Sequence, residues 1–143
     1  MRILIVEDEK VSSQKMQFIM NNFGECCAVA RGADAIETFS DACKNKVPYD
    51  IITLDINLDD MSGLSVLQSI KATEEQMKIP QTKRAKIIMV TSREDEVAMA
   101  TSKSAQCDAY IVKPFTLSTM AACLEKIWAD YTKMLSYYDV TNR

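Results

Sequence analysis

The chain has no histidine among its 143 residues. This absence excludes Ser-His-Asp triads, histidine metal ligands and the usual general base near neutral pH. Glycine is scarce too. The three glycines Gly24, Gly32 and Gly63 are too widely spaced for a dinucleotide fingerprint or a Walker A phosphate loop. Any phosphate chemistry in this chain must therefore depend on side chains and a metal ion.

Long hydrophobic runs are also missing. The apolar run Ile3–Val6 is far too short for a secretory signal or a membrane span. We therefore expect a cytoplasmic protein with no membrane partner. The formal net charge is −3, from 17 basic and 20 acidic residues, which argues against direct DNA binding. The length suits one domain, and 48% hydrophobic residues can supply one sizeable core.

The cysteines are odd in number and contain no C-x-x-C pair: Cys26, Cys27, Cys43, Cys107 and Cys123. Without a secretory signal, this pattern predicts small buried thiols in a reducing compartment. The adjacent Cys26 and Cys27 suggest an alternative, a redox or metal site. Neighbours on a strand point to opposite faces, however, which disfavours such a site.

Five short apolar runs, beginning near residues 2, 26, 51, 87 and 110, alternate with helical patterns. Most of these runs are continuous, which is typical of parallel strands buried on both faces. Strand then helix, repeated five times, predicts an α/β fold: a doubly wound five-stranded parallel sheet with helices on both faces. The first helix is expected to pass through Val11, Lys15, Phe18 and Ile19 and to end at about residue 22. The second is expected at 33–46, the third through Leu64, Leu67 and Ile70, and the fourth at 94–104. The fifth is expected from Leu117 to about Leu135, with Thr116 as its N-cap.

The interval between the third and fourth runs is longer than the others by about a dozen residues. The extra segment, 74–86, contains the cations Lys78, Lys83, Arg84 and Lys86. It is either a solvated extension of the third helix with a loop, or a docking patch for an acidic partner. One domain is expected over 1–135, followed by a short tail over 136–143.

Polar side chains follow four of the predicted strands: Glu7, Asp8, Asp55, Thr91 and Lys113. In doubly wound sheets, ligands gather beyond the carboxyl ends of the strands. Clustered carboxylates repel each other unless a cation lies between them, and oxygen ligands alone favour Mg²⁺. A carboxylate nucleophile, a metal, a lysine and a hydroxyl together predict a phosphoryl-transfer site with Asp55 as nucleophile. Individually, Asp8 could instead be a helix N-cap, Thr91 structural and Lys113 a surface lysine.

Across about residues 2–131, the chain resembles the receiver domain of two-component response regulators, which has a CheY-like, flavodoxin-like fold. The resemblance is carried by ILIVEDE at 3–9, YDIITLDINL at 49–58, MSGL at 61–64, IMVTS at 88–92 and YIVKPF at 110–115. It implies that a partner histidine kinase phosphorylates Asp55. It also implies Mg²⁺ held by Asp55, by Asp8 directly, by Glu7 through water and by the backbone carbonyl of Asn57, with Lys113 on the phosphoryl oxygens.

The resemblance further implies a switch in which Thr91 moves towards the phosphoryl group and Tyr110 changes rotamer. This movement would reshape an output surface made by the fourth helix, fifth strand and fifth helix. Asn57 and Arg93 occupy the positions that tune phosphoryl lifetime in the family. The Lys113–Pro114 peptide bond is expected to be cis.

One departure from the family pattern lies close to the expected site. Asp59 stands four residues after Asp55, where the family often has proline, and Asp60 follows it. The extra charge either tightens Mg²⁺ binding or faces water.

Four functions follow from these expectations. The first is a single-domain phosphorylation switch acting on a partner protein, and the second is a phosphorelay intermediate that exchanges its phosphoryl group with a histidine phosphotransfer protein. The third, a haloacid-dehalogenase-like phosphatase, needs an acid two residues after the nucleophile, where Asn57 stands. The fourth is an interaction module that is not phosphorylated. We expect a signalling phosphoacceptor rather than an enzyme. A homodimer formed through the output surface is an additional alternative.

Overall fold

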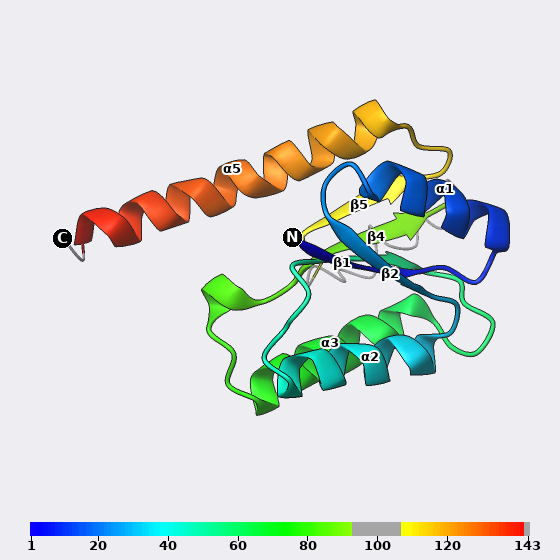
Figure 1. Ribbon diagram of the computed structural model, residues 1–143, viewed down its shortest axis with the longest axis horizontal. Helices are drawn as coiled ribbons and strands as arrows, with labels where there is room; N and C mark the ends of the chain where they lie inside the picture. The colour runs from blue at the N-terminus through cyan, green and yellow to red at the C-terminus, as the bar shows by residue number, and fades with distance from the viewer. Residues whose placement is uncertain (93–106, 142–143) are drawn as a thin grey trace.

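The computed structural model describes residues 1–92 and 107–141, with side chains through residue 129. Its centre is one five-stranded sheet in the order β2-β1-β3-β4-β5, with every neighbouring pair parallel (Figure 1). The sheet confirms the predicted doubly wound topology. Its strands are β1 (Arg2–Val6), β2 (Glu25–Val29), β3 (Ile51–Asp55), β4 (Lys86–Thr91) and β5 (Ala109–Val112).

Helices cover both faces of the sheet (Figure 1). One face packs against α1 (Lys10–Met20) and α5 (Leu117–Thr141), and the other packs against α2 (Gly32–Lys44) and α3 (Gly63–Gln76). Each face encloses its own hydrophobic core. The fourth helix expected at 94–104 lies outside the described residues, as does Arg93. Within the described part of the chain, no helix is long and apolar enough to cross a membrane.

Burial separates the central strands from the edge strands. All five residues of β3 are buried, as the continuous apolar pattern predicts. The same prediction is wrong for β2, an edge strand on which Cys27 is exposed. The cysteines are free, but the prediction that they are buried is also wrong, because Cys26, Cys43, Cys107 and Cys123 are only partly covered.

The predicted first helix is present, but Ile19 is the one buried residue among the four whose spacing predicts it. Val11 and Phe18 are 70% and 78% exposed, so they do not belong to the core-facing stripe. That stripe is formed by Met16, Ile19 and Met20. The helix ends at Met20, close to the predicted position, with Asn21 as its C-cap.

The fifth helix is longer than predicted. Thr116 accepts the backbone N–H of Thr119 at 3.2 Å, which confirms the predicted N-cap. The helix then continues to Thr141, beyond the end predicted at Leu135 and into the segment expected to be a tail. Neither proline nor glycine occurs after Pro114 to terminate it. Its carboxyl-terminal part projects past the sheet (Figure 1).

Candidate functional site

Three carboxylates meet at the carboxyl ends of β1 and β3. Oxygen atoms of Glu7, Asp8 and Asp55 all lie within 4.8 Å of one another. The sheet produces this proximity, because Val6 pairs with Leu54 in register and the next residue on each strand is acidic. Glu7 and Asp55 are buried, whereas Asp8 is partly exposed. The structure thus brings together the three side chains that sequence spacing placed at one sheet edge.

Lys113 lies between two of these carboxylates. Its Nζ donates to Asp55 Oδ2 at 3.0 Å and to Glu7 Oε1 at 3.2 Å. Its backbone N–H donates to the Thr91 carbonyl at 2.8 Å, which ties the residue to the end of β4. Burial lowers the pKa of Lys113, but Asp55 and Glu7 outweigh this effect and raise it overall. The Lys113–Pro114 peptide bond is cis.

The carboxylate cluster holds more negative charge than one lysine can compensate. Burial, together with a hydrogen bond to Asp55 and the charge of that residue, raises the pKa of Glu7 to about 8, against the opposing effect of Lys113. Burial and the nearby Asp59 also raise the pKa of Asp8. Both shifts indicate a site that is stabilised by an added proton or by a cation.

Asp59 and Asp60, the two acids that depart from the family pattern, have different environments. Asp59 is exposed and acts on Asp8 by charge and by a hydrogen bond. Asp60 instead accepts the backbone N–H groups of Gly32 and Ala33, at 2.8 and 3.0 Å. It therefore caps α2 from a distant loop, in place of Arg31, whose side chain makes no capping bond.

The loop from β3 to α3 is held close to β3, the strand that carries Asp55. The Asn57 N–H donates to Asp55 Oδ1 at 3.0 Å, and the Gly63 N–H donates to the Ile56 carbonyl at 2.6 Å. A Cβ atom at Gly63 would collide with the backbone of Asp55 and Ile56. Glycine is needed here because α3 begins against the backbone of the strand that carries Asp55.

A small cavity of about 10 Å³ lies beneath the carboxylates, lined in part by Glu7, Asp55, Lys113 and Thr53. Thr53 is buried on β3, and its Oγ1 has no hydrogen-bond partner among the described residues. The sequence analysis did not single out Thr53. A hydroxyl within the apolar run 51–54, two residues before Asp55, was the available signal.

The remaining predicted residues lie around this cluster. Thr91 is buried at the end of β4, and its hydroxyl donates to the Ser92 carbonyl at 3.0 Å. Tyr110 is half exposed on β5. The N-cap of α1 is Glu9, which accepts the N–H groups of Val11 and Ser12, so the alternative N-cap role considered for Asp8 is wrong.

The donor set suits a hard divalent cation. Glu7, Asp8 and Asp55 offer oxygen atoms alone, within the range that one ion can bridge, and thiols and imidazoles are absent from the cluster. The raised pKa of Glu7 agrees with a carboxylate cluster that needs a counter-ion. Mg²⁺ therefore fits these residues.

An acidic pocket at the carboxyl edge of a β2-β1-β3-β4-β5 sheet, with a lysine from the β5–α5 connection, defines a receiver domain. The family model for the response regulator receiver domain matches residues 3–125. The chain belongs to this family of two-component signalling proteins.

Curated relatives give the same assignment. Chemotaxis protein CheY-3 of Vibrio cholerae is 29% identical over 128 residues, which cover 90% of this chain and 92% of that protein. Transcriptional regulatory protein QseB of Haemophilus influenzae is 26% identical over 132 residues, covering 89% of this chain and 52% of QseB. The chain thus spans about half the length of several relatives that it matches.

Solved structures share the fold. The receiver domain protein from Clostridium thermocellum superposes with a TM-score of 0.71 and 20% identity, covering 94% of this chain and 98% of that one. The chemotaxis response regulator CheY4 of Vibrio cholerae gives a TM-score of 0.68 and 23% identity, covering 88% of this chain and 97% of that one.

Proposed function

We propose that Asp55 accepts a phosphoryl group from a phosphohistidine on a partner kinase or phosphotransfer protein. The observation that carries this proposal is the position of Asp55. One of its carboxylate oxygens lies 3.0 Å from Lys113 Nζ, and the group faces Glu7 and Asp8 across a single ion-sized space. Because these 143 residues contain no histidine, the donor histidine must lie outside them.

In the proposed reaction, an Asp55 oxygen attacks phosphorus in line and the P–N bond to the donor imidazole breaks. The imidazole nitrogen leaves with the electron pair of that bond, and Asp55 becomes an acyl phosphate. Lys113, already bound to Asp55, would contact the new phosphoryl oxygens. Glu7, Asp8, Asp55 and the Asn57 carbonyl would hold Mg²⁺, which when bound neutralises charge on the transferring group.

The proposed switch begins at Thr91. Its hydroxyl must leave the Ser92 carbonyl before it can donate to a phosphoryl oxygen. That movement would free space for Tyr110, which lies half exposed on the next strand, to change rotamer. The surface around β5 and α5 would then bind an output protein, or a second copy of the chain, according to the state of Asp55.

A phosphorelay role uses the same chemistry in reverse, with a histidine of a phosphotransfer protein taking the phosphoryl group from Asp55. A phosphatase of the haloacid-dehalogenase type is disfavoured, because Asn57 stands where that mechanism needs an acid. We therefore propose a cytoplasmic signalling phosphoacceptor that catalyses only its own phosphorylation and dephosphorylation.

The test uses a small-molecule acyl phosphate as donor, with Mg²⁺, and intact-mass spectrometry as readout. The wild-type chain is expected to gain the mass of one phosphoryl group, and Asp55→Asn is expected to gain none. Asp50→Asn, at the opposite end of the same strand, is the matched control and should be modified like wild type. Equal modification of all three chains would overturn the proposal.

A further inference from the structure

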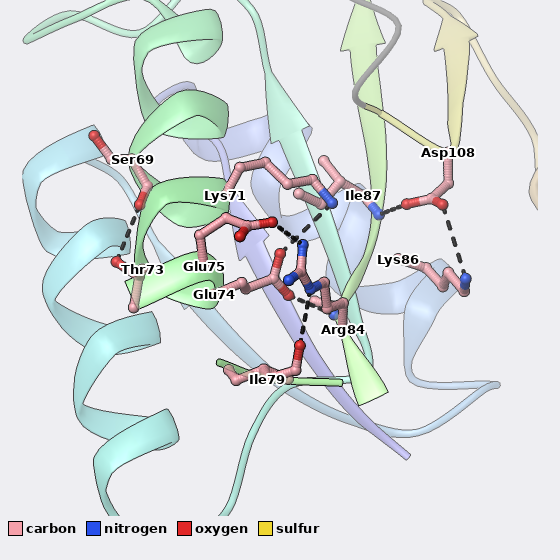
Figure 2. Close-up of polar contacts among 11 residues, drawn as sticks. Ser69, Lys71, Thr73, Glu74, Glu75, Ile79, Arg84, Lys86, Ile87 and Asp108 are labelled. Carbon is pink, nitrogen blue, oxygen red and sulfur yellow. Dashed lines mark hydrogen bonds and ion pairs between the residues drawn. The ribbon is translucent and has the colours of Figure 1, made fainter. Parts of the chain in front are cut away.

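The basic segment 74–86 is largely exposed, but hydrogen bonds hold it as a structured arm. Glu74, on the last turn of α3, is buried and accepts the Ala85 N–H at 2.9 Å (Figure 2). Its other oxygen lies 3.5 Å from Lys71 Nζ. This carboxylate fastens the end of α3 to the start of β4. The expectation of a solvated extension is therefore only partly correct.

Arg84 fastens the arm a second time. Its Nη1 donates to Glu75 at 2.9 Å and its Nε donates to the Ile79 carbonyl at 3.1 Å (Figure 2). The helix end is closed by paired hydrogen bonds from Lys78 to Glu75 and from Ile79 to Glu74, with Lys78 in the left-handed region at φ 53°. A short 3-10 turn, η1 (Gln81–Lys83), completes the arm.

An open pocket of about 180 Å³ lies between the arm and α5. The pocket is lined by η1, by α5 and by residues at or just before the starts of β3 and β4: Pro48, Asp50, Thr82, Lys83, Arg84, Lys86 and Trp128. Asp50 precedes β3, whereas Asp55 ends that strand. The pocket therefore lies at the opposite end of the sheet from the phosphoacceptor site.

The charge of this pocket contrasts with the negative charge of the chain as a whole. Three cations line it together with one carboxylate, Asp50, which already accepts the Arg2 N–H at 2.7 Å. Arg84 is paired with Glu75, and Lys86 lies 3.9 Å from Asp108. Lys83 is exposed, and no ion pair to it is found among the described residues. Lys83 thus offers the pocket a cation for a negatively charged ligand.

We propose that this pocket binds a carboxylate-rich segment of a partner protein. Lys83 pairs with a carboxylate of the segment, while Trp128 and Pro48 contact an apolar or aromatic side chain next to it. The pocket is smaller than those that enclose drug-sized ligands, so it accommodates one or two side chains rather than a whole small molecule. This inference does not depend on phosphorylation of Asp55.

Trp128 provides the readout, because it is the only tryptophan of the chain and it lines the pocket. The probe is a capped peptide of glutamates around one phenylalanine, titrated while Trp128 emission is recorded. The control peptide replaces each glutamate with glutamine. We expect a saturable change with the acidic peptide alone, weakened by added salt.

Variants then assign the binding to Lys83. Lys83→Gln is expected to weaken binding of the acidic peptide by about five-fold, the upper range for an exposed ion pair. Lys78→Gln, which removes an equal charge from the arm outside the pocket lining, is expected to change it by less than about two-fold. Both variants should still be phosphorylated at the wild-type rate, which separates this proposal from the function proposed above.

Three results would overturn the inference. The first is a titration that does not saturate or that is unchanged by Lys83→Gln. The second is an equal loss in both lysine variants, which would indicate attraction to the overall charge of the arm. The third is the same saturable change with inorganic phosphate alone, which would assign the pocket to free anions rather than to a protein segment.

Discussion

The carboxylate of Asp60 accepts the backbone N–H of Gly32 at 2.8 Å, across 28 residues of sequence. The loop that follows β3 therefore caps α2. The Cβ position of Gly32 also lies against the Met61 side chain, so the helix start and the loop are closely packed. This contact gives the loop beside Asp55 a fixed support.

Replacement of Asp60 tests this support. Asp60→Ala is expected to lower the melting temperature, because two N–H groups at the start of α2 lose their acceptor. Those hydrogen bonds also lower the pKa of Asp60 below its ordinary value of 3.8. A lowered folded-state pKa stabilises the fold above pH 3.8 and loses its effect as the pH falls through the folded-state value.

The measurement for Asp60 is thermal unfolding by circular dichroism at neutral and acid pH without Mg²⁺. The difference from wild type should shrink as the pH falls. Asp59→Asn serves as the neighbouring control and should not lower the melting temperature, since Asp59 caps no helix among the described residues. An Asp60→Ala variant as stable as wild type at neutral pH would show that the cap is dispensable.

The second prediction concerns Glu7. Its pKa is raised from the ordinary 4.5 to about 8, so the metal-free folded chain keeps this proton at neutral pH. The stabilisation from that proton is complete below pH 4.5 and is lost as the pH rises through about 8. A bound Mg²⁺ must displace the proton, so Mg²⁺ affinity should rise with pH by up to about ten-fold per unit until about pH 8.

Calorimetric titration with Mg²⁺ between pH 6 and pH 9, in buffers of different ionisation enthalpy, measures both the affinity and the protons released. Glu7→Gln should remove most of the pH dependence, because that variant has no proton to release at this position. An affinity that stays constant across the range in the wild-type chain would contradict the assignment of Glu7.

The third prediction concerns the close approach at Gly63. Gly63→Ala is expected to lower the free energy of unfolding by about 1–3 kcal/mol, because its Cβ would meet the backbone of Asp55 and Ile56. Gly32→Ala should cost less, since its Cβ meets the flexible side chain of Met61 and that of Val66. Urea unfolding of both variants checks the order. A larger loss of unfolding free energy for Gly32→Ala than for Gly63→Ala would contradict this order. It would show that the backbone of Asp55 and Ile56 adjusts to a Cβ atom more easily than the side chains of Met61 and Val66 do.

Much of this structure could be predicted from sequence, because its main features depend on local patterns. Continuous apolar runs marked the buried central strands, and the acids directly after the runs of β1 and β3 marked the site edge. Glu7 and Asp55 come together for that reason: their strands are neighbours in parallel register. Lys113 reaches Asp55 for the same reason, because it directly follows the last parallel strand at the same edge of the sheet.

Other features depend on contacts that a local pattern does not encode. Asp60 caps a helix from 28 residues away, and nothing in its own neighbourhood indicates that partner. The sequence predicts Glu74 as part of a solvated helix extension. In the structure Glu74 is buried, because the arm returns to the sheet and places the Ala85 N–H against its carboxylate. Phe18 belongs to the spacing that predicts α1, but it is exposed, and the buried stripe of α1 lies on the side of Met16 and Met20. In each case tertiary packing decided the environment of the residue.

The central claim is that Asp55 carries the phosphoryl group. Sodium borohydride reduces an acyl phosphate to an alcohol, so a phosphorylated aspartate becomes homoserine, which tandem mass spectrometry can locate. After treatment with a phosphoryl donor and Mg²⁺, the account predicts homoserine at position 55 and at no other position. Homoserine at Asp8 or Asp59, or its absence from position 55 in a chain that has gained phosphate, would contradict the account.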